Sequence, residues 1–270
     1  MKTVLTIKAW KRPYYMKEVL ASLERAVGIE DVLVIVLCDG GQTGQNQDKR
    51  DEMRRMVQQS SVPKIFFEEV VGSNGCAGMT RKCFERAFMY PVDYAIHMDD
   101  DVIVGKDVFQ YFEYAHQQFG KDERVFAYGS FIRGAQRTGK PQDLGKVLTS
   151  TLFETGGAVA FHRDRWNEII SLGGLFGANG IGRVDQEGWN GPDEWKKKVD
   201  VNDHGSWGYP GNRFFCRGRS VCYPEASRSQ NVGAKEGLWN PSENWHQANI
   251  LDPYFIDILN PEGQPVNFRR

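Results

Sequence analysis

The sequence has no long hydrophobic run. No stretch of its 270 residues approaches the ~20 apolar residues of a membrane-spanning helix. The opening segment MKTVLTIKAW is apolar but short, and it lacks the longer apolar region and cleavage site of a signal peptide. We therefore expect a soluble protein without a membrane span, located in the cytoplasm.

Neither charge sign is in excess, and cysteine is sparse. Lys and Arg number 34 against 35 Asp and Glu, so whole-protein attraction to nucleic acid is not indicated, although a local basic groove stays open. The five cysteines include no CxxC pair, so structural zinc is not expected. Reduced thiols are the simplest interpretation, although Cys216 and Cys222 could pair in an oxidising compartment.

Apolar and amphipathic segments alternate over residues 1–119. The expected strands and helices of this part are strands over 3–10, 31–40, 64–71 and 93–98, and helices over 12–27, within 42–60, over 79–90 and over 107–119. The nearly continuous apolar run before Asp39 is typical of a strand buried on both faces of a parallel sheet. The alternation predicts an open α/β sheet covered by helices, which binds ligands outside the carboxyl ends of its strands.

The pattern weakens beyond residue 120. The segments 124–132 and 156–166 have the composition of strands. Residues 174–215 are rich in Gly, Trp, Asn and Asp and have little periodicity. A loop-rich region of this length within a compact domain is usually functional.

Three carboxylates, Asp99, Asp100 and Asp101, directly follow the fourth expected strand. If the strand continued through them, Asp99 and Asp101 would lie on one side and Asp100 on the other. Adjacent carboxylates suit Mg²⁺ or Mn²⁺, which take one or two of them together with phosphate oxygens and water. The alternative is a solvated turn in which an aspartate caps the next helix.

This combination resembles the glycosyltransferases of the GT-A fold, in which a DxD-type motif after the fourth strand holds a metal against the diphosphate of a nucleotide sugar. Four segments are similar, in the same order, to the β-1,2-N-acetylglucosaminyltransferase I family and its protein O-mannose relative: TIKAWKRPYYMKEVLASL, VLVIVLCDGG, HMDDDVIVGKDVFQYF and RGRSVCYPEASRSQNVGAKEG. The resemblance implies a Rossmann-like, mostly parallel nucleotide-binding sheet with a smaller mixed acceptor-side region.

On this basis we expect one catalytic domain over residues 1–270. Its nucleotide-sugar-binding half would span residues 1–119, its acceptor and catalytic half residues 120–239, and its C-terminal tail residues 240–270. The first half carries the carboxylates, and the second contains the loop-rich region.

The resemblance also implies roles for residues at the strand ends. Asp101 would bind the metal directly, Asp99 would support the metal through water, and Asp100 would meet the ribose hydroxyls. Asp39 would accept a hydrogen bond from the uracil imide. Arg12 would face the diphosphate, which a guanidinium suits.

Four further residues are expected to bind the donor nucleotide sugar. Arg81 would border the donor site, although a surface ion pair with Glu85 explains it equally well. Gly156 and Gly157 would let the sugar approach the backbone, unless they form a β-bulge. Arg228 would help to bind the diphosphate or order the late segment.

The resemblance further implies that the catalytic base is an Asp shortly before a tryptophan, upstream of the Arg-Gly-Arg segment. In VDVNDHGSWG, Asp203 precedes Trp207 and is the preferred base for the acceptor hydroxyl. Asp200, Glu194 and Asp193 are the alternates.

The resemblance therefore implies an inverting glycosyltransferase that uses a UDP-sugar and Mn²⁺ or Mg²⁺. The acceptor hydroxyl could belong to a glycan, a glycolipid, a protein or a modified nucleic-acid base. Two alternatives stay open. A nucleotidyltransferase also places carboxylates behind Rossmann-like strands, but it usually begins with a glycine-rich loop, and KAWKRPYY has no glycine. A GT-A relative could also bind sugar without catalysis.

Overall fold

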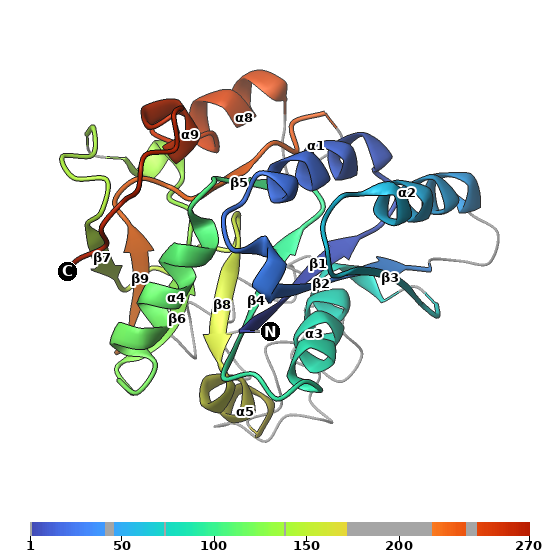
Figure 1. The fold of residues 1–270 in the computed structure, drawn as a ribbon, viewed down its shortest axis with the longest axis horizontal. Coiled ribbons are helices and arrows are strands. Elements are labelled where there is room, and N and C mark those ends of the chain that lie inside the picture. The colour runs from blue at the N-terminus through green and yellow to red at the C-terminus, as the bar shows by residue number, and fades with distance from the viewer. Residues whose placement is uncertain (1, 41–45, 73, 138, 172–217, 236–241) are drawn as a thin grey trace.

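A central sheet organises the computed structural model, which describes residues 2–40, 46–72, 74–137, 139–171, 218–235 and 242–270. Within these residues, eight strands form one sheet in the order β3-β2-β1-β4-β8-β6-β9-β7 (Figure 1). The strands are β1 (Thr3–Ala9), β2 (Val32–Asp39), β3 (Ile65–Val70), β4 (Tyr94–Asp99), β6 (Val125–Gly129), β7 (Val147–Ser150), β8 (Val159–His162) and β9 (Ser220–Pro224). A separate two-stranded ribbon pairs β5 (Val102–Val104) with β10 (Ser229–Asn231) in antiparallel register.

The first four strands pair in parallel in the order 3-2-1-4, which is the order of a Rossmann-type half-sheet. The strands of the second half continue the same sheet. β8 runs antiparallel to both β4 and β6, β6 pairs in parallel with β9, and β7 closes the edge in antiparallel orientation. This arrangement confirms the expected α/β class, with a mostly parallel sheet and a mixed region beside it.

Helices cover both faces of the sheet (Figure 1). They are α1 (Pro13–Glu24), α2 (Gln47–Gln59), α3 (Gly75–Phe88), α4 (Val108–Phe119), α5 (Arg163–Ser171), α8 (Glu243–Asn249) and α9 (Ile256–Leu259). The first helix begins at Pro13 because proline has no N–H to lose there and its φ angle already suits a helix. Its buried side chains, such as Met16, Val19 and Leu23, recur at helical spacing.

The sheet separates two hydrophobic cores, and β2 contributes to both. Val34 and Val36 pack with buried residues of α1, α2 and α4, whereas Ile35 and Leu37 pack with those of α3 and α5. All eight positions of β2 are buried. The continuous apolar run therefore does form a strand covered on both faces.

Two element boundaries differ from the sequence prediction. The helix expected from residue 79 begins earlier, at Gly75. The strand expected over 156–166 ends at His162, and the chain continues as α5. Arg163 stabilises this change of direction because its guanidinium donates to three backbone carbonyls, one at the end of α3 and two in the turn before β4.

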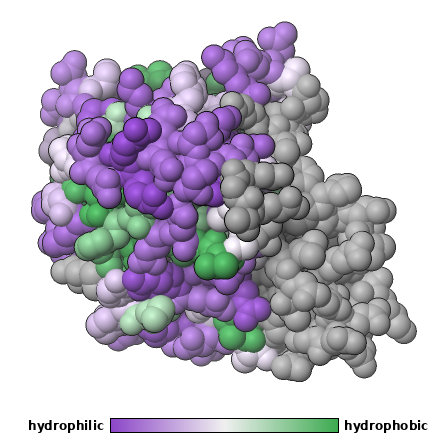
Figure 2. Space-filling view, turned by 90° about the vertical axis from the view of Figure 1, so that its right-hand side faces the viewer, coloured by the Kyte–Doolittle hydropathy of each residue, from purple (hydrophilic) through white to green (hydrophobic). Residues whose placement is uncertain are grey.

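The C-terminal tail packs against the rest of the molecule. Phe255 and Ile256 form a small buried cluster with Ala226, and Asp252 is fully buried. On the face shown in Figure 2, most of the described surface is hydrophilic and the hydrophobic areas are small. Of the helices in the described part of the chain, none combines the length and apolar character needed to cross a membrane.

Candidate functional site

The carboxyl ends of β1, β2 and β4 meet at one edge of the sheet. In the parallel registers, Lys8 of β1 lies opposite Asp99 of β4, and the next residue of β1 lies opposite Cys38 of β2, which precedes Asp39. This is the edge where open α/β sheets bind their ligands. The fold therefore brings Asp39 and the three consecutive aspartates to the same edge, as the sequence predicted.

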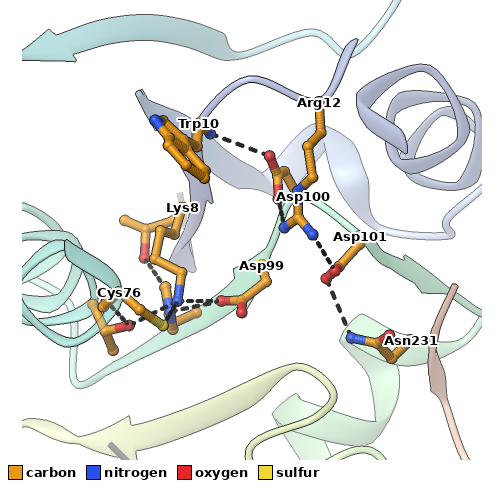
Figure 3. Close-up of polar contacts among 11 residues, drawn as sticks. Lys8, Trp10, Arg12, Cys76, Asp99, Asp100, Asp101 and Asn231 are labelled. Carbon is orange, nitrogen blue, oxygen red and sulfur yellow. Dashed lines mark hydrogen bonds and ion pairs between the residues drawn. The ribbon is translucent and has the colours of Figure 1, made fainter. Parts of the chain in front are cut away.

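The three aspartates do not alternate as a continued strand would require. Strand β4 ends at Asp99, and the chain turns at Asp100 and Asp101 before β5 begins. As a result, Asp99 points toward Lys8, while Asp100 and Asp101 both point toward Arg12 (Figure 3). The alternation considered for a continued strand therefore does not apply here, because β4 ends at Asp99.

A single guanidinium bridges Asp100 and Asp101. Arg12, just before α1, donates from Nη1 to Asp101 Oδ2 at 2.7 Å and from Nη2 to Asp100 Oδ1 (Figure 3). The backbone N–H of Trp10 also donates to Asp100, at 3.2 Å. The two carboxylate side chains are only 2% and 9% exposed and that of Arg12 is 15% exposed, so this charge cluster is largely shielded from water.

Burial and charge pairing act in opposite directions on these carboxyl groups. Burial raises the pKa of Asp101 to about 6, against the lowering effect of Arg12. Burial raises the pKa of Asp100 as well. The pKa of Arg12 is also raised, because the two carboxylates outweigh the effect of its own burial. The guanidinium therefore stays charged and acts as the counter-cation of the pair.

Asp99 has a cation of its own on the α3 side of the sheet. Lys8 Nζ lies 2.9 Å from Asp99 Oδ1, 2.8 Å from Cys76 Sγ and 3.4 Å from Thr80 Oγ1. Burial alone would raise the pKa of Asp99, but Lys8 and His97 outweigh it and hold that pKa below its usual range. Lys8 was not among the predicted site residues, and its only signal in the sequence is that it is a charged residue within an apolar strand.

The late segment of the chain also contacts the carboxylates. Asn231, at the end of β10, donates from Nδ2 to Asp101 Oδ1 at 3.2 Å, and its Oδ1 lies 3.1 Å from Nε2 of His246. Gly233 packs so closely that a Cβ there would lie 2.1 Å from Asp101 Oδ2. Asn231 and His246 were not among the predicted site residues, because they reach the site only through tertiary contacts.

Asp39 and Arg81 have partners within the protein. The carboxylate of Asp39, at the end of β2, accepts from the backbone N–H of Asn74 at 3.1 and 3.2 Å and from its side-chain amide. This contact holds the turn that leads into α3. Arg81, on α3, donates to Glu85 at 2.7 Å, which is the surface ion pair considered above. Roles in donor binding stay predictions for both residues.

Gly156 and Gly157 allow the loop before β8 to pack tightly against Phe131. A Cβ on Gly157 would lie 2.2 Å from Phe131 Cβ and 2.5 Å from Ser229 Oγ, and one on Gly156 would lie 3.1 Å from the Phe131 ring. Packing alone therefore explains why position 157 has no side chain. A close approach of the sugar to these glycines stays a prediction.

Arg228 is fully buried. It donates at 2.6 Å to the carbonyl oxygens of Ala226 and Leu144, and it forms an ion pair with Asp107 at 3.1 Å. Burial lowers its pKa, against the effect of Asp107. These contacts tie β10 to the start of α4, so the geometry supports the ordering role expected of Arg228 rather than contact with a diphosphate.

The carboxylates do not form a complete metal cage. In the part of the chain that the structure describes, no three His, Cys, Asp or Glu side chains are grouped so that they could hold a metal ion. The predicted base Asp203 and its alternates Asp200, Glu194 and Asp193 lie outside the described residues.

Comparisons with known proteins give similarity of fold only. No family model and no curated protein matches the chain. The solved structures that resemble it include TarS 1–349 of S. aureus in complex with UDP-GlcNAc, with 13% identity, a TM-score of 0.40 and coverage of 54% of this chain and 38% of that one. A mannosyltransferase, PcManGT from Pyrobaculum calidifontis in complex with GDP-Man and Mn²⁺, has 14% identity, a TM-score of 0.44 and coverage of 84% and 58%.

The galactosyltransferase LgtC, with donor and acceptor sugar analogs, has 15% identity, a TM-score of 0.46 and coverage of 82% of this chain and 72% of that one. The present chain thus spans well under half the length of the TarS chain. Since these scores are low, the choice of function depends on the chain's own residues.

Proposed function

We propose that the chain is a metal-dependent glycosyltransferase of the GT-A type, which moves a sugar from a UDP-sugar to an acceptor hydroxyl. The observation that carries the proposal is the burial of Asp100 and Asp101 around a shared cation, at the ligand-binding edge of a Rossmann-type half-sheet. These residues are only 1% and 6% exposed, which argues against a solvated acidic turn. Carboxylates are rarely buried in this way without a cation.

The residues present fit a divalent metal. Asp101 would hold Mn²⁺ or Mg²⁺, which need only one or two protein carboxylates when phosphate oxygens and water complete the coordination. Asp100 beside it would meet the ribose hydroxyls. The Arg12 guanidinium already occupies a cation position between these two groups. When bound, the metal would offset negative charge on the departing diphosphate.

The chain's own side chains would orient the donor. Asp39 would accept a hydrogen bond from the uracil imide, which favours uracil over cytosine because cytosine has no proton at that nitrogen. Arg12 and Lys8, both from the carboxyl end of β1, would place positive charge near the diphosphate. Arg81, Gly156 and Gly157 are proposed to border the donor, and Asp99 to support the metal through water.

The acceptor side of the proposal depends on residues 174–215. Asp203, or its alternates Asp200 or Glu194, would take the proton of the acceptor hydroxyl. The oxygen would then attack the anomeric carbon opposite the diphosphate, and the configuration would invert. N-acetylglucosamine is the donor sugar that the family resemblance favours.

Product analysis tests this proposal. The chain is incubated with UDP-N-acetylglucosamine, other UDP-sugars and GDP-mannose, with Mn²⁺ or with EDTA, and released nucleotide is measured. We expect UDP release that requires the metal, occurs slowly with water as acceptor, and is lost in Asp101→Ala. Release of pyrophosphate from UTP and a sugar phosphate would instead identify a nucleotidyltransferase. Full activity in Asp101→Ala would contradict the proposal.

A further inference from the structure

Two arginines near the candidate site are held in different ways. All three nitrogens of the Arg228 guanidinium have hydrogen-bond partners, and its side chain is fully buried. Arg12 is held by Nη1 and Nη2, whereas its Nε is buried without a hydrogen-bond partner among the described residues. A buried donor without a partner costs free energy, so the position of Arg12 is less fully satisfied than that of Arg228.

The surroundings of Arg12 would also allow it to move. Its side chain is the most exposed of the three in the cluster, at 15% against 2% for Asp100 and 9% for Asp101. It lies at the start of α1, outside β1, so moving the guanidinium would break no strand pairing. The Cζ atom of Arg12 lies 5.7 Å from the centroid of the Tyr15 ring. A displaced guanidinium could therefore stack on this ring through a cation–π contact.

We propose that Arg12 is an internal counter-cation that a divalent metal displaces, and that the released guanidinium then binds the diphosphate of the donor. The inference rests on the proposed function. A metal bound to Asp101 would meet the guanidinium at contact distance, since Nη1 lies 2.7 Å from Oδ2. Two cations at such a distance repel each other strongly in a shielded site, so one of them must leave.

This exchange makes Arg12 a positioning residue that couples metal and donor. Without a metal, the guanidinium is held by the carboxylates and is not available to a diphosphate. Without a donor, a metal must compete with the guanidinium and therefore binds weakly. Metal and nucleotide should consequently strengthen each other's binding by the same factor, as linkage requires.

Metal binding in the absence of nucleotide gives the sharpest test. We compare wild type, Arg12→Gln and Lys11→Gln by titrating Mn²⁺ and measuring free Mn²⁺ by electron paramagnetic resonance. Lys11 is the matched control: it is the neighbouring cation, and its described contact is with the Trp10 ring, at 4.1 Å. Arg12→Gln should bind Mn²⁺ at least about tenfold more tightly than wild type, because two buried carboxylates lose their partner.

The remaining readouts separate this inference from the proposed function. Mn²⁺ should raise the melting temperature of Arg12→Gln more than that of wild type or Lys11→Gln, while UDP affinity in Mn²⁺ falls. Unchanged or weaker Mn²⁺ binding by Arg12→Gln overturns the inference; the proposed function survives if wild type still binds UDP in a metal-dependent way. Absence of Mn²⁺ and UDP binding in all three proteins overturns both.

A second measurement uses wild type alone and does not depend on the variant's folding. Phenylglyoxal, which modifies arginine, is reacted with the protein, and labelling of each arginine is quantified by mass spectrometry. Mn²⁺ should speed the labelling of Arg12, and UDP added with Mn²⁺ should slow it again. Arg228, fully buried, and Arg124, with a side chain 85% exposed, serve as slow and fast references. A labelling rate of Arg12 that Mn²⁺ leaves unchanged contradicts displacement.

Discussion

Three adjacent aspartates are stable at this site because one strand end supplies two cations. Lys8 neutralises Asp99 on one side of the sheet, and Arg12 neutralises Asp100 and Asp101 on the other. Removing one partner of a buried pair usually costs about 3–5 kcal/mol, because the other charge is left without compensation. The site therefore depends on residues before α1 as much as on the acidic run itself.

The sequence predicts where the three aspartates lie but not the directions in which their side chains point. Their place after an apolar run was enough to put them at the carboxyl end of β4. The side to which each points depends on where β4 stops, and nothing local marks Asp99 as its last residue. Arg228 shows the same limit, because only distant partners such as Asp107 and the Leu144 carbonyl reveal that it is buried.

The buried role of Arg228 leads to a residue-scale prediction. In Arg228→Lys, one ammonium group cannot replace the three donor positions of the guanidinium, so we expect a loss of about 2–4 kcal/mol in unfolding free energy. Affinity for UDP in Mn²⁺ should stay within about twofold of wild type at temperatures where the variant is folded. Urea unfolding and calorimetry provide the two values. A large loss of UDP affinity without a loss of stability would instead support direct contact with the donor.

At the scale of elements, short strands place the late segment against the carboxylates. Strand β5 follows the turn at Asp101 and pairs with β10, which puts Asn231 opposite Val102. The first four strands were predictable because each is long, apolar and followed by a helical pattern. Strands such as β5 and β10 are too short to show periodicity, and they become strands only by pairing with distant residues.

The loop before β8 offers a test of element packing. In Gly157→Ala, the new Cβ would collide with Phe131, and we expect the free energy of unfolding to fall by about 1–3 kcal/mol. Gly139→Ala is the matched control, because a Cβ there meets no atom within 4 Å. Urea denaturation of both variants and wild type gives the comparison. Equal stability of the two variants would show that the loop tolerates a side chain at position 157.

At the scale of the whole molecule, the alternating pattern of residues 1–119 was enough to predict the class of fold. It predicts strands buried between two layers of helices, and both cores of the structure are built in that way. The second half was harder to predict, because antiparallel strands such as β7 and β8 are short and α5 begins directly after a strand. The positions of these elements are determined by pairing with and packing against the sheet rather than by a pattern in their own sequence.

A half-buried histidine on α4, His116, makes the free energy of unfolding depend on pH. His116 stacks between the rings of Tyr94 and His162, and burial, together with the charge of His162, lowers its pKa against the effects of Asp93 and Glu113. The unfolded chain then takes up the proton first, near pH ~6.5, so the stability contributed by neutral His116 is present above that pH and is lost as pH falls toward the folded-state pKa.

Replacing this histidine should weaken the dependence. His116→Phe keeps an aromatic ring in the stack but cannot titrate. Between pH 7 and pH 5, the variant should lose less unfolding free energy than wild type, by at most about 1.4 kcal/mol per pH unit for one proton. Guanidinium unfolding at several pH values measures both slopes. Identical slopes would mean that His116 takes up its proton equally in the folded and unfolded states.

The central claim is that this edge of the sheet binds a nucleotide through a metal. Calorimetric titration of UDP, GDP and CDP, each with Mn²⁺ and with EDTA, tests it most directly on wild type, Asp101→Ala and the surface control Asp51→Ala. We expect UDP to bind most tightly, to require the metal, and to lose its affinity only in Asp101→Ala. The proposed function is contradicted if no nucleotide binds, or if nucleotide affinity is the same with and without the metal and with and without Asp101. The buried carboxylates would then have only a structural role.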